Sequence, residues 1–451
     1  MNSKPSESVS PARRAAFDIL SQVESKHAYG SVLLAGLSES DWSREDRALA
    51  QEIVLGVLRW QGTLDYFIER YSERPVTRLD LPVLIALRIG IYQLRHLSRI
   101  PQSAAVNESV NLVKRARTAS ASSLVNAVLR KASRYPDEIA GHRIADDLER
   151  ASVELSHPRW ILERWESAFG EHETRQLALA NNAPQANAFR VNTIQTTARE
   201  VLTGLNAAGV ITRESRIAPG AFVVEGGPAS VLIRAAHQGD IYLQEEASQL
   251  VSILLDPRSG HRVLDLCAAP GSKTSHMAML AEDNAWIIAC DRHLHRLKTL
   301  GAACRRLGIQ SVDMLALDAT GPLPWIADGL RFDRVLVDAP CSGTGTLRGN
   351  PEIKWRLSPD DIKRLVELQL ALLERGASCV ANGGRLVYST CSIEREENED
   401  VVRRFLGKAA GFVLVEPNAP AGLITDQGFV RTLPHRDGTD GFFAAILERT
   451  G

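Results

Sequence analysis

Two cysteines stand in short polar motifs toward the carboxyl end of the sequence. Cys341 belongs to the motif DAPCSGTG at 338–345, and Cys391 to the motif STCS at 389–392. Each motif follows an apolar segment of strand length. A cysteine usually fills a core as a small hydrophobic residue, but its thiolate is also a strong nucleophile. Two cysteines at neighbouring strand ends, with Asp338 beside one of them, predict covalent chemistry.

A turn of small residues follows an earlier apolar segment that ends at Asp265. Such a turn lets a backbone approach a ligand and opens a helix. It is not a P-loop, because Ser272 separates the glycine from the lysine, and it lacks the G-x-G-x-x-G pattern of dinucleotide-binding turns. The turn consists of Cys267, Ala268, Ala269, Pro270, Gly271, Ser272 and Lys273.

Two further acids follow the next two apolar segments. Asp291 comes directly after the second, where a carboxylate can accept hydrogen bonds from both hydroxyls of a ribose. Asp318 comes after the third, where it can meet the amino group of an adenine. The turn and the two acids together predict an adenosine-containing ligand without phosphates, and S-adenosylmethionine fits that description.

The thiols suggest which carbon would receive the methyl group. Carbon 5 of cytosine is too weak a nucleophile to attack a methyl donor unaided. A thiolate that adds at carbon 6 converts the ring into an enamine, whose carbon 5 can attack. Asp338 is well placed for nitrogen 3 and the exocyclic amine, and a second cysteine can help when the thiolate leaves.

The elements around these motifs predict a doubly wound α/β domain. Short apolar segments alternate with helices, and in such sheets ligands bind beyond the carboxyl ends of the strands. The five predicted strands are 263–267, 286–290, 314–317, 334–337 and 385–388. We expect this domain to span 241–451.

The preceding sequence predicts two further parts. Helical spacing of apolar residues and few β-branched runs predict an all-α bundle at 1–140. Tyr135, Pro136 and the polar stretch to Leu148 predict a linker. Residues 150–240 predict a helix followed by a small α+β subdomain, with strands at 189–191 and 222–225 and a helix at 197–208.

Composition limits the class of protein. The 451 residues hold 53 Lys and Arg against 54 Asp and Glu, but the basic excess lies within the first 135 residues, which favours phosphate contacts there. The six cysteines form no C-x-x-C pair, so we expect no metal site and no disulfide scaffold. No segment is typical of a signal peptide or a membrane helix, which predicts a cytoplasmic protein.

At these motifs the sequence resembles the RNA cytosine-5 methyltransferases, above all the bacterial 16S ribosomal RNA enzymes of the RsmB type. The likeness also covers QEEA at 244–247, the acidic residues 394–400 and LPHRDGTDGFF at 433–443. It implies a Rossmann-like class I methyltransferase domain, with Cys391 as nucleophile and Cys341 as the cysteine of product release. It also implies S-adenosylmethionine contacts from Cys267 through Lys273, Asp291, Asp318 and Asp338. The family usually has glycine where Ser272 stands.

The N-terminal helices resemble the antitermination factor NusB, an RNA-binding fold. Residues 13–20, 103–114 and 124–130 carry this likeness. The resemblance implies an RNA substrate, 16S ribosomal RNA, either free or within a small-subunit precursor. We also expect the protein to be a monomer and not to bind membranes.

Four alternatives remain open. The substrate could be another RNA, such as tRNA. An amine methylase has an acid-Pro-Pro-aromatic turn that Asp338 and its neighbours superficially resemble, but it needs no thiol. In the DNA cytosine-5 type the nucleophile follows a proline directly and would be Cys341. A non-catalytic RNA chaperone with a vestigial cofactor fold would not bind S-adenosylmethionine.

Overall fold

The computed structural model describes residues 9–37, 42–135, 144–327 and 329–451. Contacts divide the chain into two compact units. The helical unit comprises Met1–Pro184 together with Leu347–Arg356, and the sheet unit comprises Gln185–Thr346 and Leu357–Gly451. Most of the predicted linker, 136–143, lies outside the described residues.

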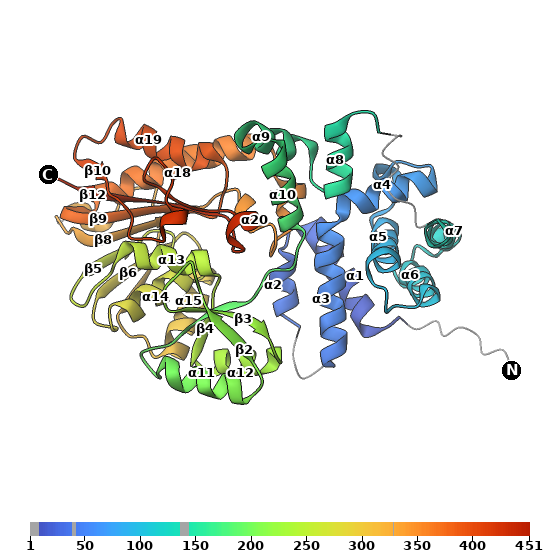
Figure 1. The fold of residues 1–451 in the computed structure, drawn as a ribbon, viewed down its shortest axis with the longest axis horizontal. Coiled ribbons are helices and arrows are strands. Elements are labelled where there is room, and N and C mark those ends of the chain that lie inside the picture. Colours follow the sequence, from blue (N-terminus) through green and yellow to red (C-terminus); the bar gives the residue numbers. More distant parts are fainter. Residues whose placement is uncertain (1–8, 38–41, 136–143, 328) are drawn as a thin grey trace. The chain divides into compact units, whose positions relative to one another are not determined.

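In the described residues, the helical unit contains the helices of the predicted bundle, those that follow them and one from the distant segment, as Figure 1 shows. The first seven are α1 (Pro11–Lys26), α2 (Gly30–Ala35), α3 (Arg44–Arg59), α4 (Gln61–Ser72), α5 (Leu81–His96), α6 (Gln102–Arg115) and α7 (Ser122–Arg134). The others are α8 (Asp147–Leu155), α9 (Arg159–Phe169), α10 (Glu171–Asn181) and α17 (Ile353–Arg356).

Helix α5 is the central helix of this unit. Pro82 lies in its first turn, where a missing N–H costs nothing, and all side chains from Val83 to Gln93 are buried. Gly90 allows α7 to approach closely, because a Cβ atom there would lie 2.6 Å from Cδ2 of Leu129. This apolar segment, in which Arg88 is the one charged residue between Val83 and Gln93, is therefore a buried core helix.

A segment remote in sequence completes the helical unit. Leu347–Arg356 leaves the sheet unit directly after the Cys341 motif and packs among α3 and its neighbours. The buried Lys354 ammonium donates to the carbonyl oxygen of Arg59 at 2.9 Å, and Nε1 of Trp355 donates to that of Leu58 at 2.7 Å. These bonds satisfy carbonyls at the end of α3 that its own helix leaves unpaired.

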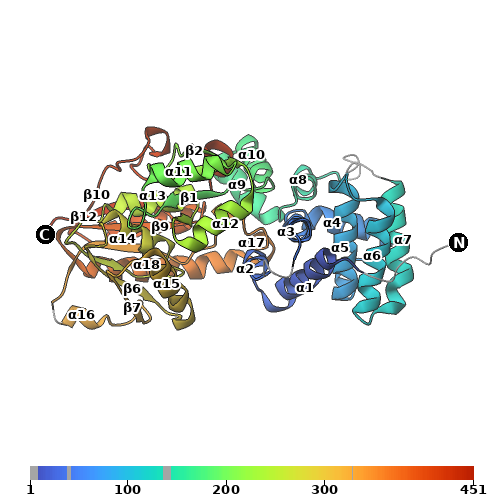
Figure 2. The same cartoon turned by 90° about the horizontal axis from the view of Figure 1, so that it is seen from below.

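The sheet unit begins with a small sheet of order β2-β3-β1-β4. Helices α11 (Ala198–Ala207) and α12 (Ala229–Gln238) pack against it, and Figure 2 shows them beside β1 and β2. Its strands are β1 (Ala188–Val191), β2 (Ile211–Glu214), β3 (Ala221–Gly226) and β4 (Ile241–Leu243). Strand β4 lies beyond residue 240 yet pairs antiparallel with β1.

The large sheet has the order β10-β12-β9-β8-β5-β6-β7, and β11 also pairs with β12. Strands β9, β8, β5, β6 and β7 are parallel, whereas β12 is antiparallel to β9. The strands are β5 (Arg262–Asp265), β6 (Trp286–Asp291), β7 (Val312–Ala316), β8 (Phe332–Asp338), β9 (Val380–Thr390), β10 (Phe412–Leu414), β11 (Val430–Thr432) and β12 (Phe442–Arg449).

Helices cover both faces of this sheet (Figure 1). On one face, buried side chains of α13 (Glu246–Leu255), α14 (Ser272–Leu280) and α15 (Leu294–Leu307) form the core with the strands. On the other, α18 (Pro359–Ser378) packs on β8 and β9, and α19 (Glu399–Leu406) packs on α18. The doubly wound arrangement is therefore confirmed, with antiparallel strands added at one edge.

All five predicted strands overlap β5 to β9, and the predicted helix 197–208 coincides with α11. The shorter strands β10 and β11 and the antiparallel β12 were not predicted. No helix among the described residues is long and apolar enough to cross a membrane.

Candidate active site

The small-residue turn connects β5 to α14. Gly271 has a φ of +107°, and a Cβ atom there would lie 2.6 Å from Cγ of Leu300, so only glycine fits. Ser272 is already the first residue of α14 and has ordinary helical geometry. A serine in place of the family's glycine therefore requires no unusual backbone angle, and the exposed amides of a helix start remain beside the turn.

Asp265, at the end of β5, is almost completely buried behind this turn. Its Oδ2 atom accepts a hydrogen bond of 2.7 Å from Thr274 Oγ1. Burial raises the pKa of this carboxyl to about 7, and the negative charge of Asp338 adds to the effect. Asp265 thus ties the turn to α14 and titrates close to neutral pH.

Asp291, at the end of β6, is buried and lies next to the turn. It accepts hydrogen bonds from the backbone N–H of His293 at 2.8 Å and of Ala269 at 3.3 Å. The Arg296 guanidinium lies 3.4 Å from its Oδ2 and donates to the Ala269 carbonyl at 2.6 Å. The structure therefore brings this predicted cofactor residue together with the turn.

Asp318 occupies a different environment from Asp291. It follows β7, its side chain is 53% exposed, and Oδ1 accepts hydrogen bonds from the hydroxyl and backbone N–H of Thr320. Those bonds lower the pKa of Asp318. Its other oxygen lies 4.0 Å from Arg292. Asp318 stands at the same sheet edge as Asp291, but no bond joins it to the other predicted site residues in the described part of the chain.

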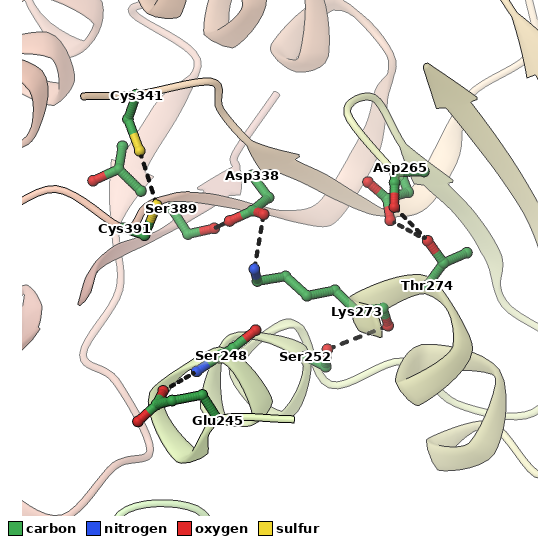
Figure 3. A network of polar contacts seen from close by, with 12 residues as sticks. Glu245, Ser248, Ser252, Asp265, Lys273, Thr274, Asp338, Cys341, Ser389 and Cys391 are labelled. Carbon is green, nitrogen blue, oxygen red and sulfur yellow. Dashed lines mark hydrogen bonds and ion pairs between the residues drawn. The ribbon is translucent and has the colours of Figure 1, made fainter. Parts of the chain in front are cut away.

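Asp338 is held by two side chains from neighbouring elements (Figure 3). Lys273 Nζ lies 2.8 Å from Oδ2, and Ser389 Oγ donates to Oδ1 at 2.7 Å. Burial opposes the positive charge of Lys273, but the negative charge of Asp338 outweighs it and raises the pKa of the lysine. The carboxyl group is therefore fixed in orientation and joined to the small-residue turn.

The two motif cysteines meet at the ends of β8 and β9. These strands are parallel with Asp338 opposite Ser389, so the loops that follow them emerge side by side. The sulfur atoms of Cys341 and Cys391 lie 3.2 Å apart, and both residues are half-buried (Figure 3). Contact with the Cys391 sulfur and burial raise the pKa of the Cys341 thiol well above its ordinary value.

Three contributions were not predicted from the sequence. Lys273 was expected to touch only the cofactor, Ser389 was read as part of a motif, and Arg296 received no role. Each has a signal in retrospect. Ser389 lies opposite Asp338 once β8 and β9 are paired in parallel, and Arg296 lies in the first turn of the helix that follows Asp291.

The donor set fits a nucleoside with no phosphate. The turn offers backbone amides and a close approach, and a buried carboxylate follows the next strand. Within the described ranges, no group of three or more His, Cys, Asp or Glu side chains is arranged to hold a metal ion. In a parallel α/β sheet the ligand lies beyond the carboxyl ends of the strands, where an acid such as Asp291 can bind ribose hydroxyls.

Comparison with known proteins identifies the family. Residues 252–448 match the family described as 16S rRNA methyltransferase RsmB/F, residues 10–134 match the NusB family, and residues 157–231 match the RsmF/B-like ferredoxin-like domain. The chain is 34% identical to the probable ribosomal RNA small subunit methyltransferase B of Bacillus subtilis, covering 97% of this chain and 99% of that protein. The chain belongs to the RsmB/F family of S-adenosylmethionine-dependent methyltransferases.

Further relatives agree with this assignment. The ribosomal RNA small subunit methyltransferase B of Pseudomonas putida is 33% identical over 97% of this chain and 98% of its own length. The crystal structure of PH0851 has a TM-score of 0.84 at 30% identity and covers 99% of both chains. The methyltransferase homolog protein from Pyrococcus horikoshii has a TM-score of 0.60 at 30% identity over 68% of this chain and all of its own. The predicted NusB-like bundle and α/β methyltransferase domain are thus confirmed.

Proposed function

We propose that this protein methylates carbon 5 of a cytosine in 16S ribosomal RNA through a covalent adduct with Cys391. The observation that carries the proposal is the pair of thiols 3.2 Å apart at adjacent parallel strand ends. Transfer to a nitrogen or to a hydroxyl requires no such pair, whereas carbon-5 transfer needs one thiol to add and a second group to help release. The relatives named ribosomal RNA small subunit methyltransferase B support small-subunit ribosomal RNA as the substrate.

Cys391 is the proposed nucleophile. Its sulfur adds to carbon 6 of the cytosine, and the ring electrons move to make carbon 5 nucleophilic. The raised pKa of the Cys341 thiol disfavours that residue as the attacking thiolate. When bound, S-adenosylmethionine supplies the electrophilic methyl group. Afterwards a base takes the carbon-5 proton, the electrons of that C–H bond restore the double bond between carbons 5 and 6, and Cys391 leaves carbon 6 as a thiolate. Cys341 assists this release.

Asp338 and Lys273 are proposed to bind the cytosine at nitrogen 3 and at its exocyclic amine. An ionised carboxylate can accept a hydrogen bond from the exocyclic amine, but it cannot donate one to nitrogen 3. Lys273 Nζ, bonded to Asp338 at 2.8 Å, holds a proton that can pass through the carboxylate as charge develops on nitrogen 3. Ser389 keeps the carboxylate oriented during this step.

The proposed cofactor contacts are the backbone of the turn and three acids. Residues 267–273 would contact S-adenosylmethionine, Asp291 would accept hydrogen bonds from its ribose hydroxyls, Asp318 would accept one from its adenine amine, and Asp338 would complete the set. The predicted domain limits (1–140, 150–240 and 241–451), a cytoplasmic location, and action as a monomer on free RNA or on a precursor particle belong to the same proposal.

The test combines a cellular and a purified system. Bisulfite sequencing of 16S ribosomal RNA from cells lacking this protein should reveal one cytosine that has lost its methyl group. The purified chain should restore that mark with labelled S-adenosylmethionine, on free RNA or on small-subunit particles. Loss of a methyl mark in tRNA, with 16S RNA unchanged, would identify tRNA as the substrate instead. Unchanged RNA together with no cofactor binding in calorimetry would favour an RNA-binding factor without activity.

A further inference from the structure

One buried carboxylate joins the two cysteine loops. Glu397 belongs to the short 3₁₀ turn Arg395–Glu397, which follows the Cys391 motif, and its side chain has no exposed surface. Its Oε1 atom accepts a hydrogen bond of 2.9 Å from the backbone N–H of Ser342, the residue after Cys341. Its Oε2 atom accepts one of 2.5 Å from the hydroxyl of Ser392, the residue after Cys391.

Two more bonds complete the environment of Glu397. The Ser342 hydroxyl also donates to Oε2, and Gln369 Nε2 of α18 donates to Oε1 at 2.8 Å. In the part of the chain that the structure describes, no Lys or Arg forms an ion pair with this carboxylate. A buried charge compensated only by hydrogen bonds is costly to keep unless those bonds are held in place. The Glu397 carboxylate therefore depends on the two cysteine loops and α18 to hold its hydrogen-bond donors in place.

The geometry points to Glu397 as a positioning residue that fixes the distance between the sulfur atoms of Cys341 and Cys391 by holding the residue after each on one carboxylate. It touches neither reacting sulfur, so it acts through the backbone of both loops. Its role in catalysis rests on the proposed cytosine reaction, but its role in geometry does not. The negative charge of Glu397 also contributes to the raised pKa of the Cys341 thiol, after the contact with Cys391 and burial.

Three substitutions separate the geometry from the charge. Glutamine has the same length, so in Glu397→Gln its oxygen can still accept from Ser342 N–H while its amide faces hydroxyls that can turn to accept. Aspartate keeps the charge but is one methylene too short to reach both loops, and alanine removes every bond. We expect Glu397→Gln to retain at least a third of the wild-type kcat, and the aspartate and alanine variants to lose tenfold or more with an unchanged KM for RNA.

Thiol cross-linking measures the position directly, without RNA or cofactor. Diamide accepts two hydrogens from two thiols, is reduced to the hydrazine, and leaves a disulfide between sulfur atoms that are already close. In chains whose other four cysteines are replaced by serine or alanine, this bond should form at least tenfold more slowly in Glu397→Ala and Glu397→Asp than in the parent, whereas Glu397→Gln should match the parent. Mass spectrometry of the linked peptides reports the rate.

A matched control guards against a general loss of stability. Glu399 is a buried carboxylate nearby that pairs with Arg431 and bonds to neither cysteine loop. Glu399→Ala should lower the melting temperature without slowing the cross-link. If Glu397→Ala does not fold, Ser392→Ala removes the bond from the Cys391 loop to Glu397, together with the contacts of the Ser392 hydroxyl to Ser342, Thr344 and the Glu394 N–H, and should slow the cross-link severalfold.

The outcomes distinguish this inference from the proposed function. Cross-linking at the parent rate in Glu397→Asp and Ser392→Ala would overturn the positioning role, whatever the activity. Slower cross-linking in a chain whose parent has no cytosine activity would uphold the positioning role and reject the proposed function. An equal loss of kcat in the Glu399 control would show that stability alone explains the activity data.

Discussion

The sulfur atoms of Cys341 and Cys391 lie 3.2 Å apart at the ends of β8 and β9, which run parallel in a register that places Asp338 opposite Ser389. The two loops that continue these strands therefore start side by side, and each carries its cysteine within three residues of the strand end. The two thiols therefore occupy one site. Their division of labour must consequently be decided by the order of events, which substitution can reveal.

Removing one cysteine at a time should separate attack from release. Cys391→Ala should lose methylation and form no adduct, because the nucleophile is absent. Cys341→Ala should methylate once and then stall as a protein–RNA conjugate that survives denaturing electrophoresis, because the release group is absent. A conjugate with Cys391→Ala and none with Cys341→Ala would assign the nucleophile to Cys341, as in the DNA enzymes.

Substitution of Asp291 should weaken cofactor binding. A hydrogen bond to a charged group is worth about 1.5–3 kcal/mol, so Asp291→Ala should raise the dissociation constant of S-adenosylmethionine roughly ten- to a hundredfold. Isothermal titration calorimetry measures this constant directly. Asp318→Ala is the matched comparison, because the exposed position of Asp318 predicts a smaller effect. An Asp291 variant that binds the cofactor like wild type would place the ribose elsewhere.

The buried carboxyl of Asp265 should make stability depend on pH. Its pKa is about 7 in the folded chain against an ordinary 3.8. Between these values the folded state keeps a proton that the unfolded chain has lost, so the free energy of unfolding falls as pH rises through this window. The loss is on the order of 4 kcal/mol and is complete above pH 7.

The variant Asp265→Asn isolates the contribution of this carboxyl group to stability. The asparagine side chain can still accept a hydrogen bond from the Thr274 hydroxyl, but it does not titrate. Urea unfolding at pH 5, 6, 7 and 8 should give a flatter profile for the variant than for wild type. Parallel profiles would mean that Asp265 keeps an ordinary pKa.

The helical unit should contribute RNA affinity that depends on salt. Arg130 and Arg134 are exposed and lie one turn apart on α7. Replacing both by alanine should raise the KM for RNA severalfold and make the salt dependence less steep by about two phosphate contacts. Affinity for S-adenosylmethionine should not change. Arg258→Ala, an exposed arginine of the sheet unit paired with Asp256, is the control. Equal salt slopes in all three proteins would assign RNA docking to another surface.

Deleting the first 135 residues is a poorer version of this experiment. The deletion would remove the partners of Lys354 and Trp355, which belong to the helical unit although they follow the Cys341 motif. A truncated chain would expose Lys354 and the indole of Trp355, which follow the Cys341 motif closely in the sequence. Its loss of activity would therefore say little about RNA binding.

The sequence predicted what periodicity and local motifs encode. The five parallel strands have near-continuous apolar runs, the small-residue turn has its own signature, and acids at successive strand ends follow from the architecture. The antiparallel strand β12 was not predicted, although 442–447 is an apolar run of the same kind, and residues 443–448 pair with residues 385–390 of β9. Pairing of that kind depends on a partner distant in sequence.

The contacts inside the site were less predictable for the same reason. Lys273 and Asp338 are 65 positions apart, and nothing near either residue indicates that they form an ion pair. Glu397 lies in a motif that the family resemblance marked as acidic, but its two oxygens reveal their purpose only once the loops after β8 and β9 are placed side by side. Motifs identify such residues, and tertiary structure assigns their partners.

The segment Leu347–Arg356 also determines when the helical unit can finish folding during synthesis of the chain. The nascent chain has presented the whole remainder of the helical unit once Pro184 emerges, but the unit stays incomplete until Arg356 follows. At about 5–20 residues per second, the delay is roughly ten to thirty seconds. During that interval the carbonyls at the end of α3 wait for Lys354 and Trp355. The helical unit therefore finishes folding only after the Cys341 motif has been synthesised.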